Sequence, residues 1–352
     1  MNAVWLIPPG AMQYASGHEP ERGLLGCHLA SVRLRVAVAA LEWKRCGNEN
    51  VFWDPGAAGA GQRADWPSAK ICVVPKFFYD VPLRPWLDAC LAAKRHGCRL
   101  VIDICDYPFK KPPPVPEFYY AVLQICDAVV VNSERMGELI SPHTTRPPLL
   151  IEDAILGSMS DPAFAPGTRV ELLWFGHPIN FPYLKARHGD LVRFATQKPC
   201  RLTIVTEDGF GIPEWTKNLQ LARAPNFDAR FNPWSLGAMP VALRECDLVI
   251  LPSDPSDPLK AGASANRLAE ALNAGRFPVA SPLPSYLPFS EAAWVGQDLV
   301  QGIEWALANP GEVVARIRRG QAIVAERYSA ATVGRRWREL FEGMLETRGS
   351  QP

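Results

Sequence analysis

Short apolar runs alternate with longer amphipathic stretches along this chain. The apolar runs predict buried strands, and the stretches with an apolar residue at every third or fourth position predict helices. Strands are expected at 3–7, 69–75, 100–104 and 128–132 in the first half, and at 171–175, 201–206, 248–252 and 277–280 in the second. Helices are expected at 28–46, 85–96, 117–126, 133–140, 312–327 and 331–346. This alternation is typical of βαβ units, so the sequence predicts an α/β fold with doubly wound, mostly parallel sheets.

The chain is long enough for two domains. Single hydrophobic cores stop growing beyond about 250–300 residues, and this chain has 352. Five prolines fall within 141–168, a composition that suits a linker because proline cannot continue a helix. We therefore predict a Rossmann-like domain with its linker over 1–165, a second Rossmann-like domain over 166–320 and a C-terminal helical segment over 321–352.

The composition narrows the function classes. With a net charge of +1, the chain lacks the basic excess of a dedicated nucleic-acid surface, so no nucleic-acid partner is expected. The nine cysteines form no C-x-x-C pair and lie mostly in apolar runs, as reduced core thiols do. We see no signal peptide and no stretch of the roughly 20 apolar residues that a spanning helix needs. These features predict a cytoplasmic protein.

Peripheral contact with the inner membrane surface is an open alternative. The last two predicted helices are rich in arginine and could attract anionic lipid. The glutamates between these arginines favour a solvated face instead.

The most informative segment covers residues 246–281. It reads as an apolar strand, a loop carrying Lys260, a short helix with Ser264 as its N-cap, a stop at Gly275 and a second apolar strand. The first amide groups of a helix lack intrahelical partners, and the helix dipole is positive there. The segment therefore predicts an anion site of phosphate size at the start of this helix.

The predicted helix has two different faces. Leu268 and Leu272 belong to an apolar stripe, whereas Asn266 and Glu270 fall on the polar side. One interpretation of the polar side is an ordinary solvated surface. The preceding Lys260 and the prolines on both flanks favour the other interpretation, a binding cleft.

These residues resemble the nucleotide-sugar site of GT-B glycosyltransferases, especially those of glycosyltransferase family 4, or group 1. The matching positions in this segment are 251–253, Glu270–Ala271, Gly275 and 278–281. Shorter similarities, in the family's order, occur at 30–35, 126–134 and 173–176. Each short motif is weak alone, and their common order makes the resemblance more specific.

The resemblance implies a GT-B architecture, in which two Rossmann-like domains face each other across a cleft and the final helix crosses back to the first domain. The donor would be a nucleoside-diphosphate sugar held mainly by the second domain, with the Glu270 carboxylate on its ribose hydroxyls. The other implied donor residues are Gly176, Lys260, Ser264, Asn266 and Arg267. The implied acceptor residues of the first domain are Gly10, Gly17, His18 and Arg33.

Ordinary solvated side chains are the alternative interpretation for several of these residues, because most exposed charged groups bind nothing. This alternative applies to Lys260 and to His18. It also applies to Arg33 and its neighbour Arg35, which could instead meet an anionic acceptor.

Two positions depart from the family's pattern. Gly262 stands where the family has the first of two paired glutamates, the one that faces the donor sugar. His177 and the next three residues follow Gly176, where the family has an arginine and a lysine that clamp the diphosphate. The identity of the sugar therefore stays open, and so does catalysis itself.

The candidate catalytic residues are His177, Asp103 and Asp106. All three lie at or just beyond the carboxyl end of a predicted strand, where α/β sheets bind ligands. For the two aspartates, which could hold an acceptor hydroxyl, the alternative is a capped turn into Pro108. Since no D-x-D triplet follows a strand, we expect no metal and no cofactor; the helix dipole and cations would stabilise the leaving phosphate. The family's stereochemistry would retain the anomeric configuration.

The leading hypothesis is a glycosyltransferase of the hexosyltransferase type. It would transfer a sugar from a nucleoside-diphosphate sugar to a sugar, lipid-linked or small-molecule acceptor, as in polysaccharide biosynthesis. A non-catalytic GT-B protein that binds a nucleotide-sugar or a partner is the second hypothesis, favoured by Gly262. A nucleotide-sugar epimerase would need an acid/base set that we do not find. An NAD-dependent oxidoreductase is disfavoured because no G-x-G-x-x-G follows the first strand.

Overall fold

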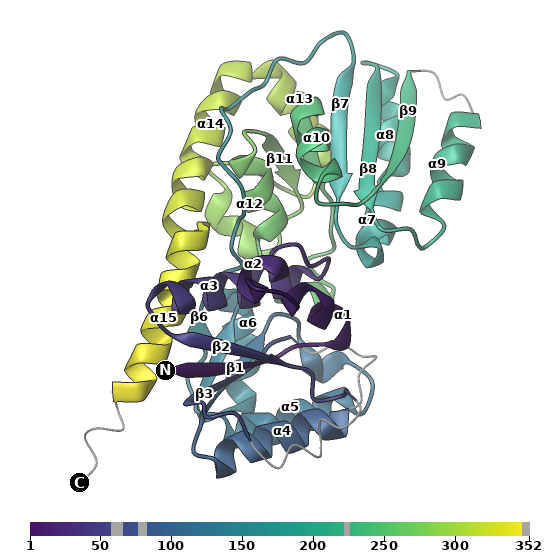
Figure 1. Ribbon diagram of the computed structural model, residues 1–352. Coiled ribbons are helices and arrows are strands. Elements are labelled where there is room, and N and C mark those ends of the chain that lie inside the picture. The colour runs from purple at the N-terminus through teal and green to yellow at the C-terminus, as the bar shows by residue number, and fades with distance from the viewer. Residues whose placement is uncertain (58–65, 77–82, 222–225, 347–352) are drawn as a thin grey trace. The chain divides into compact units, whose positions relative to one another are not determined.

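Two six-stranded parallel sheets form the framework of the chain (Figure 1). The computed structural model describes residues 1–57, 66–76, 83–221 and 226–346. The chain divides into two units. The first contains Met1–Leu156, Gly262–Ser264 and the residues from Arg327 onward; the second contains Gly157–Ala261 and Ala265–Glu326. The predicted α/β fold with doubly wound parallel sheets is confirmed.

The sheet of the first unit is parallel throughout. Its strands, in spatial order, are β2 (Glu49–Trp53), β1 (Asn2–Leu6), β3 (Ile71–Val74), β4 (Arg99–Ile104), β5 (Ala128–Val131) and β6 (Leu149–Leu150). The α-helices described in this unit are α1 (Pro9–Met12), α2 (Pro20–Leu24), α3 (Ala37–Arg45), α4 (Leu83–Arg95), α5 (Val115–Ile125), α6 (Glu134–Ile140) and α15 (Ala330–Glu346). A π-helical turn, η2 (Val32–Val36), leads directly into α3.

The sheet of the second unit has the same kind of connectivity. Its strands, in spatial order, are β12 (Trp294–Val295), β11 (Phe277–Ala280), β10 (Leu248–Leu251), β7 (Val170–Phe175), β8 (Cys200–Thr206) and β9 (Phe227–Pro233). The α-helices described in this unit are α7 (Phe181–Lys185), α8 (His188–Ala195), α9 (Ile212–Leu221), α10 (Ala238–Glu245), α11 (Pro258–Ala261), α12 (Asn266–Asn273), α13 (Leu299–Ala308) and α14 (Pro310–Ile323). Within the described residues of the chain, no helix combines the length and the apolar composition needed to cross a membrane.

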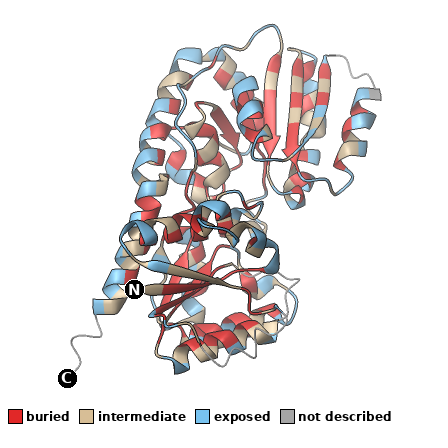
Figure 2. Ribbon diagram, viewed as in Figure 1, coloured by how far each residue is buried: buried red, intermediate tan, exposed pale blue. Residues whose placement is uncertain are grey.

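Alternate residues of the first sheet pack on opposite faces. Val4 and Leu6 of β1 belong to the core layer with α4 and α5, whereas Ala3 and Trp5 belong to the layer with α3 and α15. Both faces of the central strands are therefore buried (Figure 2). Strands buried on both faces are expected to be continuously apolar, which explains why these runs were visible in the sequence.

The last helix packs against α3 of the first unit. Trp337 and Phe341 of α15 are buried, and their rings pack edge to face on Trp5 and Trp43 at centroid distances of 6.2 and 5.3 Å. Gly334 permits the close approach, since a Cβ there would lie 2.9 Å from Cβ of Glu42. The described chain from Arg327 to Glu346 thus completes the core of the first unit.

Candidate functional site

The strand order of each sheet reverses at one point. In the second unit the reversal lies between β7 and β10, which are paired neighbours. Open α/β sheets bind ligands outside the carboxyl ends of their strands at such a point. The residues that follow these two ends are Gly176 and His177 after β7, and Pro252 and Ser253 after β10. Topology therefore selects the same place in the second unit as the sequence motif did.

Arg267 lies directly over the end of β7. A Cβ built on Gly176 would be 3.1 Å from Nη1 and 3.3 Å from Cδ of Arg267. The same Nη1 donates a hydrogen bond to the carbonyl oxygen of Phe175 at 3.4 Å. Gly176 also has a φ of 150°, a backbone conformation that residues other than glycine rarely adopt. Glycine is thus required here by its backbone conformation and by the arginine that covers it.

The helix that carries Arg267 begins later than predicted. Its N-cap is Ala265, without a side-chain cap, so the prediction of Ser264 as the N-cap is wrong. Ser264 instead belongs to the three-residue segment that packs with the first unit. The Oδ1 of Asn266 accepts a hydrogen bond from the Arg267 amide at 2.8 Å. One of the free amides expected at this terminus is therefore already satisfied.

Lys260 is held by the turn and helix that follow β7. Its Nζ donates to Oδ1 of Asn180 at 2.5 Å and lies 5.7 Å from the ring centroid of Tyr183. The Tyr183 hydroxyl in turn donates to Asp257, and burial together with this carboxylate raises the pKa of Tyr183. These contacts place the Lys260 ammonium beside the loop that begins at Gly176.

His177 caps the short 3₁₀ turn η6 (Pro178–Asn180). Its Nδ1 accepts a hydrogen bond from the Ile179 amide at 3.2 Å, so the neutral imidazole carries its proton on Nε2. The side chain is exposed. Glu270, half-buried, lies four residues after Asn266, and the two therefore share one face of α12.

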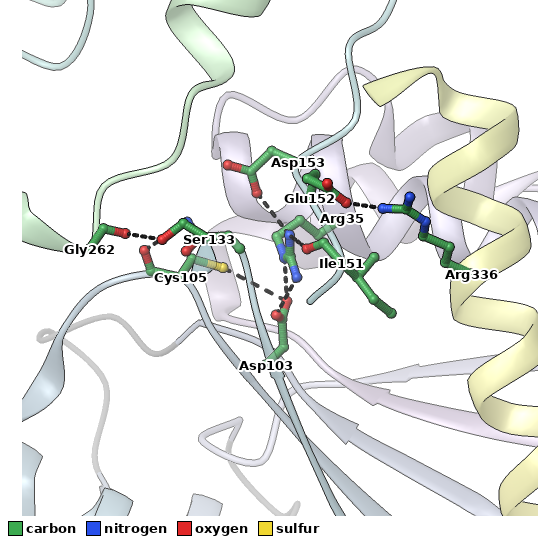
Figure 3. A network of polar contacts seen from close by, with 10 residues as sticks. Arg35, Asp103, Cys105, Ser133, Ile151, Glu152, Asp153, Gly262 and Arg336 are labelled. Carbon is green, nitrogen blue, oxygen red and sulfur yellow. Dashed lines mark hydrogen bonds and ion pairs between the residues drawn. The ribbon is translucent and has the colours of Figure 1, made fainter. Parts of the chain in front are cut away.

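In the first unit, Asp103 is an interior residue. Its side chain is 1% exposed, and its two oxygens accept hydrogen bonds from Nε and Nη2 of Arg35 at 2.7 and 2.6 Å (Figure 3). The Arg35 Nη1 donates to the carbonyl oxygen of Ile151 at 2.8 Å and to Asp153 at 3.0 Å. This pairing and the burial of the side chain argue against the catalytic role expected for Asp103, because the carboxylate is turned toward Arg35 in the interior of the unit.

Arg35 itself was expected to meet an anionic acceptor or to stay solvated, and both alternatives are wrong. It is completely buried on the π-helical turn η2, which points it at the end of β4. Its neighbour Arg33 is half-buried and donates through Nη1 to the carbonyl oxygens of Cys27 and His28, at 2.5 and 3.2 Å.

The solved structures of several glycosyltransferases resemble this chain. HepE of Anabaena, in complex with UDP and glucose, matches with a TM-score of 0.67 and 13% identity over 97% of this chain and 100% of HepE. A glycosyltransferase of Rickettsia africae matches with a TM-score of 0.64 and 11% identity over 98% of both chains. Trehalose 6-phosphate synthase of Burkholderia multivorans matches with a TM-score of 0.60 and 11% identity over 99% of both. The chain has the GT-B fold.

The predicted GT-B fold is thereby confirmed by structure alone. No protein-family model matches the sequence, and no curated protein matches it either. At these levels of identity the likeness concerns the fold, and the residues of the site must be judged by their own geometry.

The reversal point of the first GT-B sheet lies between β1 and β3. Gly10, Gly17 and His18 are all exposed and occupy the segment that follows β1. The Lys76 ammonium, just after β3, is 2.6 Å from the carboxylate of Asp106, which is half-exposed after β4. Lys76 was not among the predicted site residues, although a lysine directly after an apolar run was a visible signal.

No metal site is apparent in the part of this GT-B chain that the structure describes. Among those residues, no group of three or more His, Cys, Asp or Glu side chains is arranged to hold a metal ion. Arg267 and Lys260 supply positive charge near the reversal point of the second sheet.

Proposed function

We propose that this GT-B protein is a glycosyltransferase that transfers a sugar from a nucleoside-diphosphate sugar to a hydroxyl group of an acceptor. One observation carries the proposal: the Arg267 guanidinium covers Gly176 at the point where the strand order of the second sheet reverses. A fork of N–H donors at this position suits a diphosphate, because guanidinium groups bind phosphate oxygens in pairs.

The donor would bind to the second unit. Arg267 and Lys260 would bind the diphosphate, with help from Gly176 and the α12 terminus at Asn266. Glu270 would accept hydrogen bonds from the ribose hydroxyls. HepE, a protein of the same fold, binds UDP, so uridine diphosphate is the first nucleotide to test.

The chemistry would depend on charge at the leaving group. Two cations fixed beside the diphosphate would stabilise the negative charge that develops when the glycosidic bond breaks. We accordingly propose transfer that needs no metal ion. Retention of configuration is proposed from the resemblance to glycosyltransferase family 4. His177 and Asp106 are the catalytic candidates. Asp103 is not a candidate, because its buried carboxylate is paired with Arg35.

The acceptor would bind to the first unit. The segment after β1, with Gly10, Gly17 and His18, is exposed at the reversal point of that sheet. Arg33 would act less directly, because its guanidinium donates to the carbonyl oxygens of Cys27 and His28, which follow α2. A sugar, a lipid-linked sugar or a small molecule would each offer the required hydroxyl.

The proposed location is the cytoplasm, with peripheral membrane contact second. The arginines of α14 and α15 are mostly paired with carboxylates, which reduces their attraction for anionic lipid. The pairs are Arg316 and Arg319 with Glu312, Arg336 with Glu152, Arg335 with Glu339, and Arg338 with Glu42 and Glu342.

A non-catalytic protein that binds a nucleotide-sugar or a partner is the second candidate. Gly262 favours it, as does the interior position of Asp103. The two candidates differ in turnover and share nucleotide binding.

Calorimetric titration with UDP, GDP and ADP, followed by an assay of nucleotide release from the matching sugar donors, tests both. Nucleotide binding, together with release of the nucleotide from its sugar donor only when an acceptor is present, supports the glycosyltransferase. Nucleotide binding without such release across a broad panel of acceptors supports the second candidate. If none of the nucleotides binds or raises the melting temperature, the proposed function is wrong.

A further inference from the structure

The three residues between α11 and α12 belong to a different unit from the helices that flank them. Gly262–Ser264 packs with the first unit, whereas α11 and α12 belong to the second. Lys260 precedes this segment by two positions, and Arg267 follows it by three. Whatever fixes the segment therefore acts on the backbone that joins the two cations of the donor site.

Ser133 is the residue that holds it. The Ser133 hydroxyl donates a hydrogen bond to the carbonyl oxygen of Gly262 at 3.1 Å (Figure 3). The Ser133 hydroxyl oxygen also accepts a hydrogen bond from the Met136 amide at 3.1 Å and so caps α6. Ser133 is 7% exposed, which protects both bonds from competition by water.

Met136 fixes the segment from a second side. A Cβ added to Gly262 would lie 2.5 Å from Cε and 3.1 Å from Sδ of Met136, and 3.4 Å from Cδ1 of Leu139. Glycine is needed here for close packing, since its carbonyl could not approach Ser133 if a larger residue pushed the segment away from α6.

We propose that Ser133 is a positioning residue for the donor site. By holding the Gly262 carbonyl, it fixes the path of the chain into α12 and keeps Arg267 and Lys260 at the spacing that a diphosphate requires. This inference rests on the proposed function, because the spacing matters only if the two cations share one ligand. Ser133 itself would not contact the donor.

The first test compares two losses of a helix cap. Ser133→Ala removes both hydrogen bonds. Ser329→Ala is the matched control, because the Ser329 hydroxyl also accepts the amide of Thr332 at the start of α15 and donates to the Thr332 hydroxyl rather than to Gly262. Both variants lose a cap, and only the first loses the bond to Gly262. Ser133→Thr retains the hydroxyl.

The probe is UDP, with GDP and ADP in parallel, titrated calorimetrically into each folded variant. We expect Ser133→Ala to raise the Kd of the nucleotide about 2- to 10-fold, the range that the loss of one hydrogen bond produces. Ser329→Ala and Ser133→Thr should bind as the wild type does. Equal affinity of Ser133→Ala and Ser329→Ala overturns the positioning role.

A second variant keeps the serine. Gly262→Ala should weaken nucleotide binding with the cap of α6 intact, and adding Met136→Ala should restore part of the affinity by making room. Wild-type affinity in Gly262→Ala also overturns the inference. Failure of the wild type to bind any of the three nucleotides is a different result, which refutes the proposed function and with it the need for such positioning.

Discussion

Arg35 and Asp103 form a two-point ion pair in the interior of the first unit, at 2.7 and 2.6 Å. The arginine comes from the π-helical turn η2 and the aspartate from β4, 68 residues later. Asp153 shares the same guanidinium. Three segments that are distant in the sequence therefore meet at one buried cation.

Removal of that cation should be costly. Arg35→Ala would leave the Asp103 carboxylate buried without its partner, and breaking a buried pair typically costs about 3–5 kcal/mol. We expect the free energy of unfolding, measured by urea titration, to fall by this amount. Arg193→Ala is the control, because its pair with Asp190 on α8 is largely exposed and should contribute less than about 1 kcal/mol. Equal losses in the two variants would contradict a structural role for Arg35.

The sequence could predict the central strands because burial on both faces makes them continuously apolar. The edge strands escaped prediction. β9 carries Asp228, Arg230 and Asn232, and β6 and β12 have only two residues each. An edge strand is held by backbone hydrogen bonds to a neighbour, and such pairing leaves little pattern in its own side chains.

The sequence could predict those residues of the candidate site that belong to a local motif, but not the contacts between distant segments. Gly176 and Arg267 were found from a motif, and the structure brings them together. Asp103 was misinterpreted because the sequence places it at a strand end but does not reveal that Arg35 covers it. The N-cap was misplaced by one residue because the start of a helix depends on backbone conformation, and the N-cap of α12 is Ala265, whose side chain cannot cap.

The cysteines should differ sharply in reactivity. Cys46 is exposed and the other eight are buried and free of disulfides. Burial raises the pKa of Cys90 to about 12 and that of Cys126 to about 11, so these thiols are protonated at pH 8. Because the thiolate is the reactive form, we expect Ellman's reagent to modify one thiol rapidly in the native protein.

Denaturant should then release the remaining eight thiols. Cys46→Ser should abolish the rapid phase and leave the slow one unchanged. Two or more rapidly reacting thiols in the native protein would contradict the described burial, and fewer than nine after unfolding would indicate an oxidised pair.

Glu270 should contribute to nucleotide binding if its carboxylate accepts hydrogen bonds from the ribose. Loss of a charged acceptor typically costs about 1.5–3 kcal/mol. We expect Glu270→Ala to lower the affinity for a ribonucleoside diphosphate by that amount. The affinity for inorganic pyrophosphate, which has no ribose, should be unchanged. A folded Glu270→Ala variant that binds the nucleotide as tightly as the wild type would refute the ribose contact.

Arg267 should contribute strongly to nucleotide binding at the donor site. Its guanidinium group lies at the end of β7. A diphosphate bound there would lose two charge-assisted hydrogen bonds in Arg267→Ala. We expect the affinity for UDP, or for whichever nucleotide the protein binds, to fall about 10- to 150-fold, equivalent to about 1.5–3 kcal/mol. Arg267→Lys should recover only part of the affinity, because an ammonium group supplies charge without the planar set of N–H donors of a guanidinium.

The matched control is Arg318→Ala, an exposed arginine on α14, which should change neither the affinity for the nucleotide nor the melting temperature. If Arg267→Ala and Arg318→Ala bind the nucleotide equally well, the diphosphate does not lie at Gly176, and the donor site must be sought elsewhere.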